Sequence, residues 1–181
     1  NADLVEEKEP EIEVHEDDVE IMPIMYPVGL VHGTYIIAQN EEGMYLIDQH
    51  AAKERINYEY IKEKLSQNSI EKISLLIPLT FEFSNNEFMI LKENFEFIRN
   101  MNFEIEEFGL SSVIIKSHPI WLPSGNEVNA IKKYLDLVIE KEKNFDLAKF
   151  NDSLAALMAC KMSIKANTNI TIDEMNNLIK D

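Results

Sequence analysis

The sequence has little cysteine, little positive charge and no long apolar run. A single cysteine, Cys160, excludes an internal disulfide and fits a reducing compartment. Lys and Arg number 17 against 33 Asp and Glu, and the formal net charge is −16. A surface of this charge is repelled by DNA unless a metal ion or a basic neighbour changes the local field. No apolar run approaches the ~20 residues needed to cross a bilayer, so no membrane association is expected.

The first part of the chain differs in composition from the rest. Residues 1–20 hold ten acidic residues and one Lys and contribute −9 to the net charge, while the following residues contribute −7. We therefore interpret residues 1–22 as the end of a disordered acidic linker, with a solvated His15. Because neither an initiating Met nor a signal peptide precedes the domain, the chain is expected to be part of a longer protein.

Hydrophobic periodicity predicts an α/β (α+β) fold. A strand is expected over 28–38, a hairpin turn at 40–43 and a returning strand over 44–47, apolar enough to be buried on both faces. A long helix follows from 51 to about 65. Further strands are expected over 73–77, 79–83, 103–108 and 113–116, and Pro78 is expected to stop the first of them. Further helices are expected after Ser84, after Ser124 or Asn126, over 154–166 and over 173–180. The helix over 154–166 is expected to have its cap at Asp152 or Ser153.

Three side chains at the first strand-to-helix junction are the candidate site. Asp48 is placed to cap the helix, and His50 and Glu54 are four residues apart, so they share one helical face. The three side chains are expected to converge, and an imidazole with two carboxylates is a reasonable half-site for a divalent transition metal. The same residues are also compatible with a plain cap, a surface His and a solvated helix face.

The order of residues here resembles a known motif. Asp48-Gln49-His50-Ala51, followed by Glu54 and Glu59, is similar to the endonuclease motif in the C-terminal domain of MutL-type DNA mismatch repair proteins. Residues 29–38 and 43–47 are similar to that family's first strands, and the resemblance runs from about Tyr26 to the end of the chain.

The resemblance also gives a meaning to Ala159-Cys160-Lys161. This run matches the Ala-Cys-Arg or Ala-Cys-Lys motif that the family places beside its metal centre. Without the resemblance, we would interpret Cys160 as an ordinary small buried residue. Lys161 is suited to holding a carboxylate or a phosphate, or is simply exposed. His118, beside Pro119 and Trp121, is interpreted as structural.

The resemblance implies a metal-dependent nicking endonuclease. The metal ligands would be Asp48, His50, Glu54 and Cys160. Asp48 and Glu54 would have catalytic roles by binding the activating metal, expected to be Mn²⁺, and His50 and Cys160 would help hold a Zn²⁺-like ion. Gln49, Glu59 and Lys161 would support the site. A Cys-Pro-His-Gly-Arg-Pro-like motif that completes the family's metal site does not occur in this sequence, so weak metal binding is expected of the fragment. The alternative function is a dimerisation module without chemistry.

The resemblance implies partners as well. The implied partners are a second copy of the chain, DNA bound weakly, and a MutS-type mismatch sensor. ATP would be bound only by an N-terminal domain outside this chain. The protein would act in the bacterial cytoplasm, at the nucleoid. A sliding clamp would contact the segment 73–78, but Ile73 stands where the family has a Gln, so we interpret this segment as a strand leading into a turn.

The resemblance finally divides the chain into two subdomains. Residues 23–72 and 148–181 are expected to form a discontinuous dimerisation subdomain that carries the endonuclease motif. Residues 73–147, inserted between these two parts, are expected to form an external regulatory subdomain.

Overall fold

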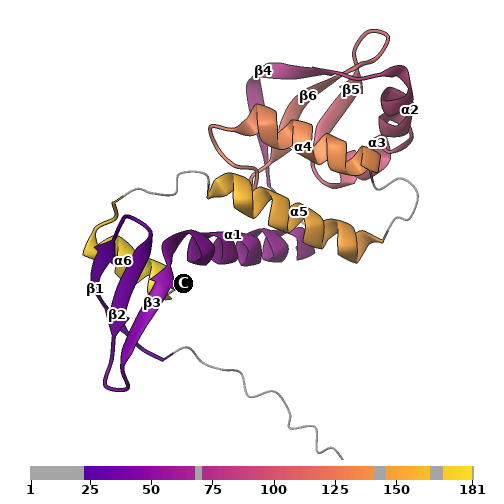
Figure 1. Ribbon diagram of the computed structural model, residues 1–181. Helices are drawn as coiled ribbons and strands as arrows, with labels where there is room; N and C mark the ends of the chain where they lie inside the picture. Colours follow the sequence, from indigo (N-terminus) through magenta and orange to yellow (C-terminus); the bar gives the residue numbers. More distant parts are fainter. Residues whose placement is uncertain (1–22, 68–70, 141–145, 164–168, 181) are drawn as a thin grey trace, which may run out of the picture.

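The chain has a mixed α and β fold with two small antiparallel sheets, in agreement with the fold class predicted from the sequence (Figure 1). The computed structural model describes residues 23–67, 71–140, 146–163 and 169–180; the predicted linker over 1–22 and His15 lie outside them. The elements are β1 (Tyr26–Val31), β2 (Tyr35–Gln39), β3 (Met44–Asp48), α1 (Gln49–Ser66), β4 (Lys72–Glu82), α2 (Asn85–Glu93), α3 (Phe95–Asn100), β5 (Glu104–Glu107), β6 (Ser112–Pro119), α4 (Glu127–Glu140), α5 (Leu147–Met162) and α6 (Ile172–Lys180).

The first sheet has the order β1-β2-β3 with antiparallel pairing throughout. The prediction of one strand over 28–38 is wrong, because His32 and Gly33 take φ values of 52° and 63° and reverse the chain between β1 and β2. The second turn is as predicted, and the Asn40 side chain accepts the backbone N–H groups of Glu42 and Gly43 at 2.9 and 3.1 Å. Both hairpins are short, so the sheet is a compact meander leading directly into α1.

Helices α1 and α5 lie side by side in the middle of the molecule (Figure 1). The cap predicted for α5 at Asp152 or Ser153 is wrong, because Asp146 Oδ1 already accepts the N–H groups of Ala148 and Lys149 and starts the helix at Leu147. The part of the predicted helix over 164–166 lies outside the described residues.

The second sheet has the order β4-β6-β5. The predicted break at Pro78 is wrong, because β4 continues through it with a register shift between Ser74 and Leu79. Proline has no backbone N–H group to donate to a neighbouring strand. An edge strand tolerates proline at positions that face away from the sheet, because no hydrogen bond to a neighbour is needed there. The helix predicted after Ser84 is present with its capping box: Ser84 Oγ accepts from Glu87 N, and the Glu87 carboxylate accepts from Ser84 N at 2.8 Å.

A continuous hydrophobic core joins the second sheet to the central helices. Phe103 stacks on Tyr134 with ring centroids 4.3 Å apart, and Trp121 meets Phe103 edge-on. Phe150 and Leu154 of α5 are fully buried in the same cluster. The core therefore fixes α5, and through it Cys160, in place. The division into a dimerisation and a regulatory subdomain stays a prediction. None of the helices described has the length and apolar character needed to cross a bilayer.

Candidate functional site

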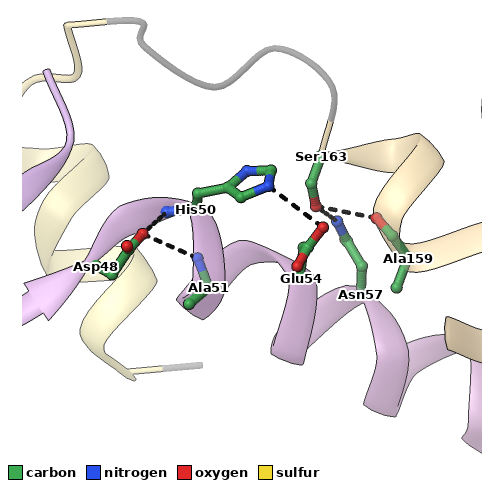
Figure 2. Close-up of polar contacts among 7 residues, drawn as sticks. All are labelled: Asp48, His50, Ala51, Glu54, Asn57, Ala159 and Ser163. Atoms are coloured by element: carbon green, nitrogen blue, oxygen red, sulfur yellow. Dashed lines mark hydrogen bonds and ion pairs between the residues drawn. The ribbon is translucent and has the colours of Figure 1, made fainter.

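Asp48 ends β3 and caps α1. Its Oδ1 atom accepts the backbone N–H groups of His50 and Ala51 at 2.8 and 3.1 Å, as Figure 2 shows. The predicted cap is thus confirmed. It satisfies two N–H groups that have no partner inside the helix and places a negative charge at the positive end of the helix dipole. The first turn, which carries His50, is held in one orientation as a result.

His50 and Glu54 face each other one turn apart on α1. The Nε2 atom of His50 lies 3.3 Å from the Oε1 atom of Glu54, and both side chains are partly exposed. The ring points along the helix towards Glu54 (Figure 2). Its Nδ1 atom is buried and has no hydrogen-bond partner among the described residues. The ring therefore presents Nε2, and not Nδ1, to the partly open side of the helix.

Cys160 reaches the same carboxylate from the last turn of α5. Partial desolvation of the thiol raises the pKa of Cys160, although the residue as a whole is exposed. Hydrogen bonding to the nearby Glu54 carboxylate and the charge of that carboxylate raise the pKa further, while the charge of Lys161 opposes the shift. Glu54, Tyr58 and Cys160 line a hollow of about 300 Å³ between the two helices. Cys160 is exposed, so the alternative reading of it as a small buried residue is wrong. Two helices, far apart in the sequence, thus bring their polar groups to one carboxylate.

The other predicted residues do not join this group. Asp48 uses its Oδ1 atom to accept backbone N–H groups of α1, as Figure 2 shows. The expected convergence of its side chain with His50 and Glu54 is therefore wrong. Gln49 is buried, Glu59 forms an ion pair with Arg55, and Lys161 is partly buried. In the parts of the chain that the structure describes, no three His, Cys, Asp or Glu side chains are arranged to hold a metal ion.

His118 belongs to the core of the second sheet. It is 4% exposed, and its Nδ1 atom lies 3.0 Å from the carbonyl oxygen of Pro119. This burial and backbone contact agree with the structural role that the sequence predicts for His118.

The residues present fit half of a metal site. Two ligands of a tetrahedral Zn²⁺, one imidazole nitrogen and one carboxylate oxygen, are about 3.3–3.5 Å apart, given the usual bond lengths. The His50–Glu54 separation of 3.3 Å matches this spacing. Thiol, imidazole and carboxylate are also the donor types that zinc prefers. The pair on α1 is therefore preformed, and a third ligand requires a rearrangement of Cys160 or a donor from elsewhere.

Sequence reasoning missed two residues at this site, Asn57 and Ser163. Asn57 Nδ2 donates a hydrogen bond to Ser163 Oγ at 3.0 Å, next to Glu54 (Figure 2). The spacing His50, Glu54, Asn57 places all three on one face of α1 and was the signal that could have found the first of them. Ser163 gave no such signal, because its partner lies on another helix.

The first sheet exposes an apolar face. Alternate positions of β2 differ sharply: Ile36 and Ala38 are fully buried, whereas Tyr35 is 41% exposed. The outer strands of the sheet contact helices, β1 with α6 and β3 with α1. On the neighbouring strand Met44 and Leu46 are 72% and 63% exposed. The prediction that these strands are buried on both faces is therefore wrong for this chain alone. The outward members are Tyr26, Val28, Val31, Tyr35, Met44 and Leu46.

A family model described as the MutL C terminal dimerisation domain matches residues 28–170. The chain belongs to this MutL C-terminal domain family. Among curated proteins it is similar to the "DNA mismatch repair protein MutL" of Bacillus pumilus (strain SAFR-032), with 43% identity over 93% of the chain and 27% of the relative. The protein of the same name from Bacillus cytotoxicus is also 43% identical, over 94% of the chain and 26% of the relative. The chain thus spans about a quarter of the length of these MutL relatives.

Proposed function

We propose that this chain is the module through which two copies of a bacterial mismatch repair protein pair, and that it carries the metal site of a DNA-nicking endonuclease. Dimerisation is supported by the family description and by the apolar face of the first sheet, which has no cover in the described part of the chain. A two-fold axis would bring the same patch of each copy together, burying Leu46 and Met44 of both.

The endonuclease proposal depends on one observation: His50 Nε2 lies 3.3 Å from the Glu54 carboxylate on α1, and Cys160 of α5 lines the same hollow as Glu54. His50 Nε2, Glu54 and Cys160 would hold Zn²⁺ after a rearrangement that brings the thiol to the pair. Asp48, through the Oδ2 atom that takes no part in the cap, would hold Mn²⁺ with Glu54 once the two carboxylates are drawn together. When bound, such an ion polarises the scissile phosphate and lowers the pKa of the attacking water. The chain's own part is to fix the donors: the cap at Asp48 orients the first turn, and the core holds α5.

A nicking assay tests this proposal. We expect the full-length protein to nick supercoiled plasmid in the presence of Mn²⁺ and the Asp48→Asn variant to lose this activity. Asn caps a helix about as well as Asp, so the variant should remain folded and dimeric. An Asp152→Asn variant, which changes an exposed carboxylate on α5, is the matched control and should nick normally. Nicking by Asp48→Asn would remove Asp48 from the mechanism.

The second candidate function is a dimerisation module without chemistry. The net charge of −16 and the lack of three converging metal donors among the described residues favour it. A wild-type full-length protein that forms dimers but does not nick with Mn²⁺ would establish this alternative.

The wider assembly follows from the same proposal. DNA would be bound weakly by this acidic chain, so affinity has to come from other parts of the protein or from a partner. We propose an ATP-binding N-terminal domain outside this chain, a MutS-type sensor as partner, and a place in the bacterial cytoplasm at the nucleoid. A sliding clamp is the weaker hypothesis: Leu76 and Ile77 are well exposed in the irregular part of β4, but Ile73 lacks the amide of the family's Gln.

A further inference from the structure

The buried apolar side chains fall into two groups of very different size. The large hydrophobic cluster runs through β4–β6, α2–α4 and α5, and it reaches α1 at Ile61. Among the described residues, the buried apolar side chains outside this cluster are Met25, Ile36, Ala38 and Met175. They belong to the first sheet, to the residue that leads into it, and to α6. Figure 1 shows β1–β3 and α6 gathered at the start of α1, away from β4–β6, and we call these four elements the sheet unit.

The sheet unit is joined to the rest of the domain through α1. β3 ends at Asp48 and α1 begins at Gln49, while α6 packs on both β1 and α1. The Gln49 N–H group donates to the carbonyl oxygen of Thr34, next to β2, at 2.9 Å. The two buried residues of α1 are Gln49 in its first turn and Ile61 in its second half. The first turn, which carries His50, is therefore positioned by the sheet unit and not by the large cluster.

By its size, the sheet unit needs support from outside. It comprises residues 23–48 and 169–180, and folding units below about 40 residues usually need a cross-link or a partner chain. The single cysteine lies on α5, so no disulfide ties this unit. Its outer face exposes large apolar side chains, among them Met44 and Leu46. The matching family model is described as a dimerisation domain, which makes a second copy of this chain the occupant of that face.

We propose that folding and pairing are coupled in this half of the domain. The second copy completes the core of the sheet unit, so separation of the copies unfolds the sheet unit while the part built on β4–β6 and α5 stays folded. The inference rests on the proposed pairing through the first sheet. Because the sheet unit positions the first turn of α1, the His50 ring is held 3.3 Å from Glu54 in the dimer and released in the monomer. Pairing thereby controls whether these two side chains face each other.

Hydrogen–deuterium exchange of the full-length protein tests the inference. Val28→Glu on β1 and Leu46→Glu on β3 each place a charge in the exposed face and should give monomers. In these monomers the amides of β1–β3, α6 and residues 49–52 should exchange at least about 100-fold faster, whereas those of β6 and α5 should not change. The factor assumes that two large apolar side chains lose their cover, each worth about tenfold in the opening equilibrium.

Two controls separate dissociation from local damage by the introduced charge. Leu110→Glu, in the turn between β5 and β6, should stay dimeric and exchange like the wild type. Dilution of the wild type below the Kd of the dimer changes no side chain and should give the same faster exchange as the two monomeric variants.

The possible results separate this inference from the proposed pairing. Dimeric Val28→Glu and Leu46→Glu proteins, or a monomeric wild type with a protected sheet unit, would overturn the pairing surface and the inference together. Monomers whose β1–β3 amides exchange as slowly as in the dimer would overturn the coupling alone. Equally faster exchange in β6 and α5 would also overturn it, because the domain would then unfold as one unit.

Discussion

Glu54 on α1 lines the same hollow as Cys160 on α5, and its Oε1 atom lies 3.3 Å from His50 Nε2. One carboxylate therefore links a strand-to-helix junction near the start of the domain to a helix near its end. This contact depends on tertiary packing, because the core beneath α5 fixes where the thiol lies.

Two substitutions of Asp48 should separate its cap from any role in metal binding. Asp48→Ala removes the acceptor for the N–H groups of His50 and Ala51 and should lower the free energy of unfolding by about 1 kcal/mol, whereas Asp48→Asn should have almost no effect. Urea unfolding of both variants measures this difference. Equal stability of the Ala and Asn variants would show that the cap contributes nothing.

The exposed face of the first sheet should be required for pairing. Leu46→Glu places a charge in the centre of the proposed interface and should shift the protein from dimer to monomer. Leu110→Glu changes a residue that is 96% exposed in the turn between β5 and β6, and it should leave the dimer intact. Analytical ultracentrifugation of the two variants decides the matter. A dimeric Leu46→Glu protein would place the interface elsewhere.

Features set by neighbours in the sequence could be predicted, whereas those set by packing could not. The caps at Asp48 and Ser84 follow from local spacing and are confirmed. The His32–Gly33 turn is not found from the sequence because β-branched and aromatic residues on both sides of it fit one long strand. The proline in β4 is not recognised as part of a strand because an edge position cannot be identified from sequence.

The candidate site was predicted only in part for the same reason. Spacing placed His50 and Glu54 on one face, as the structure has them, but only the family resemblance associated Cys160 with them. Asp48 was expected beside the pair because spacing cannot tell that a cap bond turns its carboxylate towards the backbone. Asn57 was overlooked because its partner belongs to α5.

The capping box of α2 should make stability depend on pH. Hydrogen bonds from the hydroxyl and the backbone N–H of Ser84 lower the pKa of Glu87 below its ordinary value of 4.5. A carboxyl whose pKa is lowered by folding contributes stability above its ordinary pKa, and this contribution is lost as the pH falls through the folded value. Wild type should therefore be more stable than Glu87→Gln at neutral pH, and urea unfolding at several pH values should show the difference vanish in acid.

A pH-independent difference between wild type and Glu87→Gln would contradict this assignment. Glu96→Gln changes an exposed carboxylate on α3, so it offers a control outside the capping box.

Removing the hydroxyl of Tyr134 should not destabilise the protein. This hydroxyl is buried without a partner among the described residues, and burial raises the pKa of Tyr134 well above its ordinary value. An unpaired buried hydroxyl costs roughly 1–3 kcal/mol, so Tyr134→Phe, which keeps the stacking on Phe103, should be neutral or stabilising. Thermal unfolding measures the change. A clear fall in melting temperature would show that the hydroxyl has a partner, such as a buried water molecule.

X-ray absorption at the zinc edge of the full-length protein tests the central claim most directly. We predict a first shell with sulfur as well as nitrogen and oxygen, and loss of a sulfur ligand in the Cys160→Ser variant. A zinc shell that is identical in wild type and Cys160→Ser would contradict the account, because Cys160 would then not belong to the metal site.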